Sequence, residues 1–119
     1  MDQLDRATFD HVGFVTDTAQ PGEIYLAGER CWVTDPRHHP ASIEWIRWEP
    51  DSPDRDDRPH VAFRVDDIEA AVAGHEVITP PTPTSHGARY AFIEGADGGV
   101  IELLEYDDSD APGWAGRQD

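Results

Sequence analysis

Two histidines and two glutamates occupy matching places in a sequence that repeats itself. One echo joins Phe9–Phe14 to Pro59–Phe63, and the other joins Ile43–Trp48 to Ile101–Tyr106. This alignment places His11 over His60 and Glu44 over Glu102. Imidazole and carboxylate groups are common ligands of divalent metals. Two halves related by a pseudo-twofold axis could therefore supply four ligands to one ion, and the repeat suggests that this chain does chemistry.

Alternation along the strands predicts the surroundings of these ligands. Side chains two residues apart share a face of a strand, so each glutamate lies among apolar neighbours. A carboxylate in such a place is costly to bury unless a cation compensates it. The small residues Gly13 and Ala62, each two residues after a histidine, would leave room for a metal and its ligand. A divalent ion is thus the simplest explanation.

The identity of the metal stays open among Zn, Ni, Co, Mn and Fe, because the set contains no sulfur ligand. Glu44 is the weakest of the four candidates, since it lies in the shorter half and could face water. Without Glu44, the set of His11, His60 and Glu102 would form a face of two histidines and one carboxylate. Such a face is typical of sites for Fe(II) and also suits Mn(II).

The elements that must position these residues follow from strand, cap and turn patterns. In the first half, strands are predicted at 9–16, 24–26, 31–34 and 42–48. In the second half, strands are predicted at 60–65, 76–79, 88–94 and 100–106. Asp66 or Asp67 is expected to cap a short helix that ends at Gly74, and the proline-rich residues 80–87 are expected to form a loop.

The second half thus reads β-α-β-β-β, and the first half has the same strands with too few residues before Cys31 for a comfortable helix. We expect an α+β fold of two βαβββ-type modules that form a curved mixed sheet cleft, with the first helix shortened or missing. The expected single domain divides into module one at 7–49, a linker at 50–59, module two at 60–107 and a loose tail at 108–119.

Composition narrows the class of protein. The chain of 119 residues has a net charge of −16, which argues against nucleic acid or an anionic membrane surface as a partner. Cys31 is the only cysteine, which suits a reducing compartment. No leader pattern and no apolar run long enough to span a bilayer is visible. We therefore expect a soluble cytoplasmic protein.

Two segments resemble the signatures of a known family. Residues 60–71, HVAFRVDDIEAA, and residues 92–103, FIEGADGGVIEL, resemble those of the vicinal oxygen chelate superfamily. That group includes glyoxalase I, methylmalonyl-CoA epimerase, extradiol dioxygenases and bleomycin-resistance proteins. The resemblance implies paired βαβββ modules around a metal cleft, and a homodimer. It makes His11, Glu44, His60 and Glu102 the counterparts of the metal ligands in glyoxalase-like members.

The resemblance also implies a reaction. The expected enzyme is a metal-dependent isomerase, epimerase or lyase. It would act on a small α-hydroxycarbonyl compound, keto acid or ketose through a metal-stabilised enediolate. Glu102 would be the catalytic base, with Glu44 as its counterpart on the other face. The expected substrate contacts are Arg64, Trp48, His39 and His86.

Two alternatives stay open at this stage. One is an Fe(II)-dependent dioxygenase on the same scaffold, which would use His11, His60 and Glu102. The other is a binder without catalysis that sequesters a cationic drug-like ligand, as bleomycin-resistance proteins do. The acidic charge suits the binder, whereas the retained ligand set argues against it. Whether the site forms within one chain or across a dimer also stays open.

Overall fold

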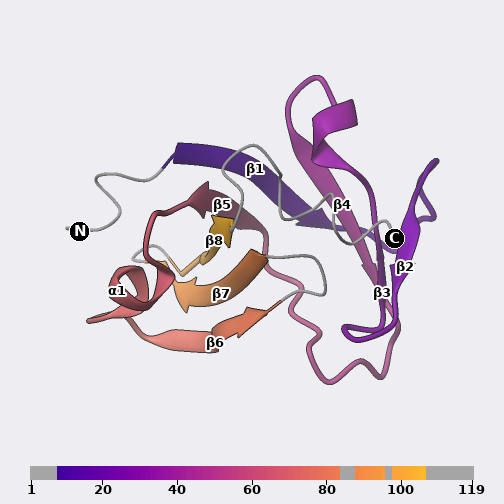
Figure 1. Cartoon of the computed structure of the whole chain (residues 1–119). Coiled ribbons are helices and arrows are strands. Elements are labelled where there is room, and N and C mark those ends of the chain that lie inside the picture. The colour runs from indigo at the N-terminus through magenta and orange to yellow at the C-terminus, as the bar shows by residue number, and fades with distance from the viewer. Residues whose placement is uncertain (1–7, 84–87, 96–97, 107–119) are drawn as a thin grey trace. The chain divides into compact units, whose positions relative to one another are not determined.

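The computed structural model describes residues 8–83, 88–95 and 98–106 of the chain. Eight strands and a single α-helix lie in these ranges (Figure 1). A 3-10 helix, η2, spans Pro36–His38. The other elements are β1 (Thr8–Val15), β2 (Ile24–Leu26), β3 (Cys31–Val33), β4 (Ile43–Trp48), β5 (His60–Arg64), α1 (Ile68–Val72), β6 (Val77–Pro83), β7 (Ala88–Glu94) and β8 (Val100–Tyr106).

These residues form two compact units. One unit contains residues 11–60, and the other contains residues 8–10 together with the described residues from 61 onward. Strands β1 and β5 each contribute residues to both units. The module boundaries expected from the sequence, 7–49 and 60–107 around a linker, remain a prediction. The tail at 108–119 lies outside the described residues.

In the unit of residues 11–60, the strands follow the order β2-β3-β4-β1. Strand β1 runs parallel to β4, with Gly13 opposite Glu44 and Phe14 opposite Trp45. The other two pairs, β2 with β3 and β3 with β4, are antiparallel. The buried apolar side chains of this unit include Leu26, Cys31, Val33 and Ile46. A mixed sheet thus carries the first half.

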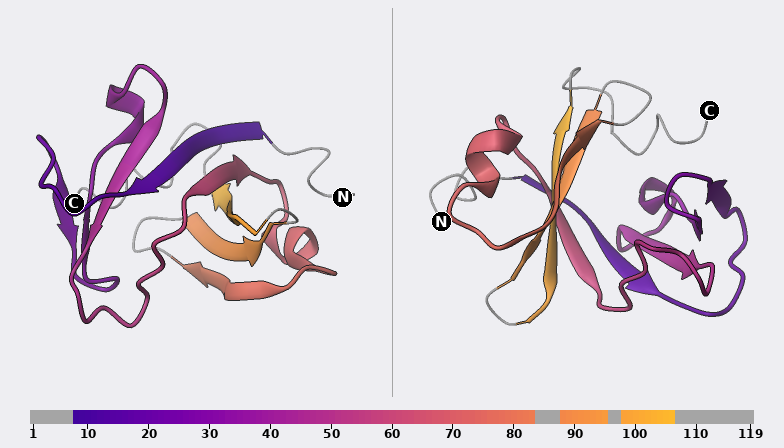
Figure 2. Two further views of the ribbon diagram at one scale, coloured as in Figure 1. Left: turned by 180° about the vertical axis from the view of Figure 1, so that it is seen from behind. Right: turned by 90° about the horizontal axis from the view of Figure 1, so that it is seen from below.

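In the other unit, the order is β5-β8-β7-β6, and β7 forms antiparallel pairs with both of its neighbours. Helix α1 covers one face of this sheet, as the further views show (Figure 2). The buried core shared by the helix and this sheet consists of Ile68 and Ala71 of α1 together with Val65, Ala91, Ile93 and Leu103. Burial of this apolar area, rather than helix propensity, stabilises so short a helix.

Both ends of α1 match the sequence pattern. Asp67 precedes the helix in an extended conformation, and its side chain accepts a hydrogen bond from the Ala70 N–H. Gly74 follows the helix with φ of 81°, a left-handed conformation that glycine adopts without strain. The cap at Asp67 and the stop at Gly74 are therefore confirmed.

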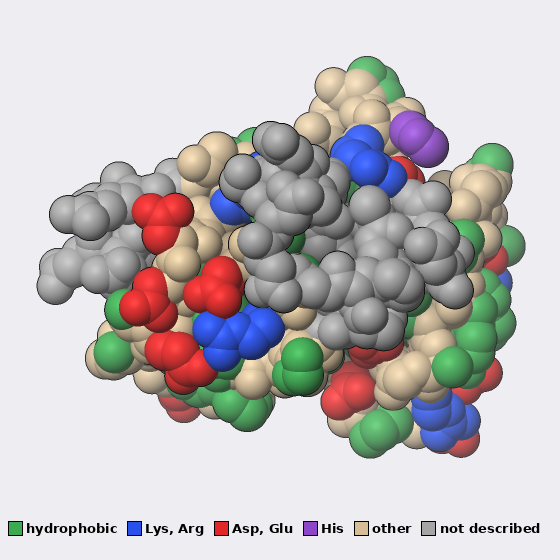
Figure 3. Space-filling view, in the orientation of Figure 1, with side chains coloured by type: hydrophobic (Ala, Val, Ile, Leu, Met, Phe, Trp, Pro, Cys, Tyr) green, Lys and Arg blue, Asp and Glu red, His purple; other side chains and the backbone are tan. Residues whose placement is uncertain are grey.

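Charged side chains gather over α1 and the neighbouring strands (Figure 3). The Arg89 guanidinium donates hydrogen bonds to Glu69 Oε1 at 2.6 Å and to Glu105 Oε1 at 2.9 Å. The other oxygen of Glu105 accepts the Ile68 N–H at 3.0 Å, which ties the start of α1 to β8. Part of the acidic charge thus has a structural role in this unit.

The backbone bears out the internal repeat. In each half the first strand lies beside the last, β1 next to β4 and β5 next to β8. The Thr16 N–H donates to the Ile46 carbonyl at 2.9 Å, and the Val65 N–H donates to the Leu104 carbonyl at 2.8 Å. These two hydrogen bonds occupy equivalent places in the alignment that pairs His11 with His60 and Glu44 with Glu102. The α+β class with two βαβββ-type modules is confirmed, and residues 16–23 of the first half contain no helix.

The proline-rich segment departs from expectation. Residues 80–83, predicted to lie in a loop, continue strand β6 to Pro83. Strand β6 lies at the end of the strand order and pairs with β7 through two shifts in register. Proline has no N–H to donate and is tolerated on an edge strand, where only one side is paired. Residues 84–87 lie outside the described residues. No helix among the described residues is long and apolar enough to cross a membrane.

Candidate metal centre

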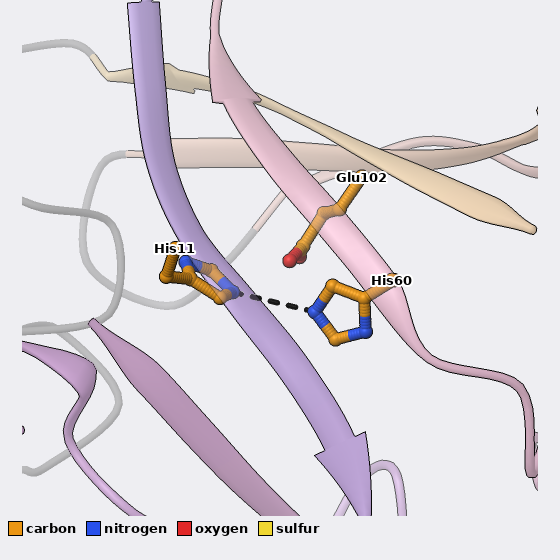
Figure 4. Close-up of side chains that lie close together, drawn as sticks. All are labelled: His11, His60 and Glu102. Atoms are coloured by element: carbon orange, nitrogen blue, oxygen red, sulfur yellow. Dashed lines mark hydrogen bonds between the residues drawn. The ribbon is translucent and has the colours of Figure 1, made fainter. Parts of the chain in front are cut away.

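Three ionisable side chains converge in the unit of residues 11–60. His60 Nε2 lies 3.3 Å from His11 Nε2. Glu44 Oε1 lies 3.5 Å from each of these two nitrogens. Figure 4 shows the imidazoles of β1 and β5, with the contact between their Nε2 atoms dashed. Within this unit, the structure therefore brings together His11, His60 and Glu44, which are three of the four residues that the repeat singled out.

Strand register explains how these side chains meet. Because Gly13 is opposite Glu44 in the parallel pair β1–β4, their side-chain positions lie on the same face of the sheet. His11 precedes Gly13 by two residues and shares that face. The two rings meet edge to face, with centroids 5.4 Å apart and planes at 82°. Local alternation thus places the groups, and the parallel pairing brings them together.

All three side chains are buried. His11 and Glu44 are each 2% exposed, and His60 is 6% exposed. Burial alone would raise the pKa of Glu44, but hydrogen bonds and charge from His11 and His60 outweigh it and lower the pKa to about 2. Glu44 is therefore ionised at neutral pH, and the imidazoles compensate a charge that would otherwise be costly to bury.

The geometry and donor types fit a divalent metal. The three atoms form a nearly equilateral triangle with edges of 3.3, 3.5 and 3.5 Å. A tetrahedral ion with bonds of about 2.0–2.2 Å has ligand–ligand edges of roughly 3.3–3.6 Å. Two imidazole nitrogens and one carboxylate oxygen also suit the borderline divalent ions of the first transition row. A proton on one Nε2 can donate to the other Nε2 or to Glu44 Oε1, so a single proton does not satisfy all three contacts, whereas a cation would.

Glu102 lies in the other unit, on β8 opposite Phe92 of β7. Its side chain is 2% exposed and is among the largest fully buried side chains. Glu102 is the repeat counterpart of Glu44, so both halves bury a carboxylate at the same place in the last strand. Its role as a ligand and base remains a prediction.

The expected substrate contacts have structural partners of their own. The Arg64 guanidinium lies 4.3 Å above the Tyr106 ring, and the Tyr106 hydroxyl donates to Asp10 Oδ2 at 2.7 Å. The Trp48 indole N–H donates to the Asp56 carbonyl at 3.2 Å. These contacts orient Arg64 and Trp48, and their contact with a substrate remains a prediction.

The histidines of the loops differ in their surroundings. His39 follows η2, donates its N–H to the Pro36 carbonyl, and accepts the Ala41 N–H on Nδ1 at 3.0 Å. This ring therefore helps to form the turn before β4, and its role in substrate binding stays a prediction. His38 points outward with its side chain 80% exposed. His86 lies outside the described residues.

Gly13 has a different role from the one expected. A Cβ atom built at Gly13 would lie 2.1 Å from His60 Cε1 and within 2.6 Å of both ring nitrogens. The space at Gly13 is thus filled by the His60 imidazole rather than left for a metal and its ligand. The sequence signal was a glycine inside a strand, which often marks a close approach, but the approaching group was not evident.

Comparisons with known proteins agree with the fold. No family model and no curated protein matches the chain. Among solved structures, methylmalonyl-CoA epimerase from Mycobacterium tuberculosis is similar, with 20% identity, 90% of each chain covered and a TM-score of 0.59. The Mn(II)-bound glyoxalase from Novosphingobium aromaticivorans has 15% identity, a TM-score of 0.44, and coverage of 83% of this chain and 38% of its own. A glyoxalase/bleomycin resistance protein/dioxygenase from Nocardioides has 16% identity, a TM-score of 0.37, and coverage of 90% of this chain and 88% of its own.

The first of these similarities extends over nearly all of both chains. This structural similarity agrees with the order of the strands and the helix. It also agrees with the sequence resemblance of the motifs at 60–71 and 92–103. The chain therefore shares the fold of this solved structure, which is the fold that the sequence resemblance implied.

Proposed function

We propose that this protein is a metal-dependent isomerase, epimerase or lyase for a small α-hydroxycarbonyl compound, keto acid or ketose. The observation that carries the proposal is the buried triangle of His11 Nε2, His60 Nε2 and Glu44 Oε1. A divalent ion held there, whether Zn, Ni, Co, Mn or Fe, would supply Lewis acidity toward a substrate carbonyl. The reaction then needs a base to move a proton at the neighbouring carbon.

We assign His11, His60 and Glu44 to the metal and add Glu102 as the fourth ligand. Two facts support Glu102. It occupies the place in the second repeat that Glu44 occupies in the first, and it is a buried carboxylate beside the buried Leu103 and Leu104. A carboxylate in such surroundings requires a cationic or hydrogen-bonding partner.

Glu102 is also the better candidate for the base. A general base works best when its pKa lies near the operating pH. The two imidazoles hold the pKa of Glu44 at about 2, so Glu44 has a weak affinity for a proton at neutral pH. Glu44 therefore serves chiefly to hold the cation, while Glu102 removes the proton and returns it.

Metal content is the first test. Elemental analysis of protein purified without chelator is expected to show about one metal ion for each set of His11, His60 and Glu44. The His60→Ala variant is expected to lose this ion. His38→Ala is a matched control, because that side chain is 80% exposed. If wild-type protein stays metal-free after incubation with each of the five ions, the proposed enzyme is wrong and sequestration becomes the better explanation.

Proton removal is the second test, and it needs no knowledge of the product. Candidate substrates incubated in D₂O would exchange the proton next to the carbonyl, which NMR detects directly. Glu102→Gln is expected to retain much of the metal and to lose about 10²–10⁴-fold in exchange rate, whereas His60→Ala loses both. Wild-type exchange by Glu102→Gln would show that another group is the base.

One observation favours a second candidate function. His11, His60 and Glu44 alone already form a set of two histidines and one carboxylate, the arrangement typical of Fe(II) oxygenases. The expected set, which used Glu102 as the carboxylate, stays a prediction. Anaerobic loading with Fe(II), followed by measurement of oxygen consumption with catechols or keto acids, separates the two functions.

We further propose a homodimer that acts on a small molecule in the cytoplasm. Cys31 supports this compartment, because it is buried and is the only cysteine of the chain, so it has no second cysteine in the chain with which to form a disulfide. The three-residue edge strand β2 and the exposed aromatic rings near it support pairing of two copies.

A further inference from the structure

The His60 imidazole lies against the backbone of Gly13. A Cβ atom built at Gly13 would lie 2.1 Å from His60 Cε1, 2.5 Å from His60 Nε2 and 2.6 Å from His60 Nδ1. All three distances are shorter than any real Cβ contact. The φ angle of Gly13 is not in the left-handed region, unlike those of Gly22, Gly74 and Gly98. Glycine is therefore required at this position by the ring and not by the backbone conformation.

We infer that Gly13 is a positioning residue of the metal centre, whose missing side chain forms the seat of the His60 ring. The part of this inference that concerns metal binding rests on the proposed function. The seat holds His60 Nε2 at 3.3 Å from His11 Nε2 and at 3.5 Å from Glu44 Oε1. Because Gly13 is also opposite Glu44 in the β1–β4 pair, one short stretch of β1 sets the relation among all three ligands.

A single methyl group at this position changes the ligand geometry. The ring atoms nearest the new Cβ would have to move by about 1 Å or more, whereas ligand distances in metal sites hold within roughly 0.2 Å. The backbone at this position accepts a methyl group, since alanine adopts an extended strand readily. The expected defect is therefore in the arrangement of the ligands, with all ligands still present.

The seat exists in the first half of the repeat alone. Its counterpart in the second half is Ala62, which carries a methyl group and is fully buried at 0% exposure. The repeat is thus symmetric in its histidines and glutamates and asymmetric at the residue two places after each histidine. We conclude that His60 is the imidazole whose ring lies against a glycine.

The test compares Gly13→Ala with Gly28→Ala. Gly28 is a matched control, because a Cβ atom there meets nothing within 4 Å and its φ is also outside the left-handed region. Co²⁺ is the probe, followed by titration calorimetry and by its visible absorption, which reports coordination geometry. Gly13→Ala is expected to weaken Co²⁺ binding about 10-fold to 100-fold and to change the spectrum of the bound ion. Gly28→Ala is expected to match the wild type.

A second measurement keeps the inference testable if Gly13→Ala is unstable. Urea denaturation of the metal-free protein is measured for wild type, Gly13→Ala, His60→Ala and the double variant. The methyl group is expected to lower the unfolding midpoint when His60 is present and to have little effect when His60 is replaced by alanine. An equal loss in both backgrounds, or wild-type Co²⁺ affinity and spectrum in Gly13→Ala, would overturn the inference.

Failure of the proposed function gives a different result. If wild-type protein binds neither Co²⁺ nor any of the other four ions, the metal-dependent enzyme is rejected, while the denaturation cycle still decides whether Gly13 seats the His60 ring. If wild-type protein binds Co²⁺ and the cycle shows no coupling between the two positions, the seat is rejected and the metal centre stands.

Discussion

Glu44 carries a full charge inside the protein and touches both histidines. Its low pKa of about 2 reflects stabilisation by the two imidazoles that exceeds the cost of burial. The same property makes Glu44 a strong ligand for a cation, since no proton competes for its oxygens at neutral pH. At the scale of single residues, the lowered pKa of Glu44 supports the proposal that this glutamate holds a cation.

We expect Glu44→Gln to weaken metal binding more than a change outside the ligand set does. The amide keeps the shape of the side chain but lacks the negative charge that opposes the cation. Loss of partners around the ligands costs about 10–100-fold in affinity, so loss of a ligand's charge is expected to cost at least about 100-fold. Titration calorimetry with Zn²⁺ measures the effect.

Glu49→Gln provides the control for this change. Glu49 lies just beyond the same strand and accepts a hydrogen bond from Arg30 at 2.9 Å, with its side chain 26% exposed. An effect on Zn²⁺ affinity as large as that of Glu44→Gln would indicate that general negative charge, and not the triangle, attracts the ion.

At the scale of elements, η2 leads the chain from β3 into β4 and so places Glu44. Asp35 caps η2 by accepting the Arg37 N–H at 2.8 Å, and its carboxylate also binds the Arg37 guanidinium. Burial would raise the pKa of Asp35, but the hydrogen bonds and charge of Arg37 lower it below the ordinary value. The cap is thus an ionised and largely buried carboxylate.

Asp35→Asn is expected to reduce the free energy of unfolding by about 1–2 kcal/mol at pH 7, from loss of a charged cap. Because the pKa is lowered in the folded protein, this stability is fully present above the ordinary value of about 3.9. It is lost as the pH falls through the folded value. Urea denaturation at pH 7 and at successively lower pH should therefore show the variant and wild type converging in acid.

The exposed pair of Arg30 and Asp51 supplies the comparison for Asp35. Asp51 accepts a hydrogen bond from Arg30 at 2.7 Å, but its side chain is 74% exposed. Exposed ion pairs contribute little to stability, so Asp51→Asn should leave the denaturation curve unchanged. A pH-independent loss in Asp35→Asn would show that the ionised cap is not the cause.

Much of the element order could be predicted from the sequence, because each element has a local signal. Asp67 and Gly74 bound α1, and alternation of apolar residues marks β7 and β8. The end of β6 at Pro83 could not be predicted. Proline is excluded from a central strand but tolerated in an edge strand, and the sequence does not say which place a strand takes in the sheet. Tertiary position decided this case, and no local pattern records it.

The residues of the candidate site could be predicted from the sequence, whereas one of the contacts that positions them could not. The correspondence of His11 with His60 and of Glu44 with Glu102 is visible in the sequence, because the residue types match although the two halves differ in length. The seat at Gly13 depends on a contact between residues far apart in the chain. The pattern showed a small residue beside a histidine, and the contact partner required the folded backbone.

At the scale of the whole molecule, the repeats differ in how they cover the face opposite their glutamates. In the second repeat, Leu103 is fully buried beneath α1. In the first repeat, the corresponding residue is Trp45, whose ring lies 5.9 Å from that of Phe14, and Phe14 is 38% exposed. Tyr25 is 44% exposed beside Trp32. Aromatic rings thus occupy the face that lacks a helix.

We expect this aromatic face to take part in the proposed homodimer. Arg47 lies above the Trp32 ring and pairs with Glu23, so the charges on this face are neutralised locally in a chain with a net charge of −16. Two such chains repel each other through their remaining charge, and salt screens this repulsion over about 10 Å at 0.1 M. The dimer should therefore be weaker at low ionic strength and stronger at moderate salt.

Sedimentation or light scattering at several salt concentrations measures the mass against 13.3 kDa for one chain. Phe14→Gln is expected to shift the equilibrium toward the monomer at least about tenfold, because it removes a large apolar ring from the face. Ile78→Gln is the control, since Ile78 has a similar exposure of 39% and lies on β6. If both variants dissociate equally, the pairing does not depend on the aromatic face. A monomeric wild type at every salt concentration would reject the dimer itself, and each chain would then have to complete its metal centre alone.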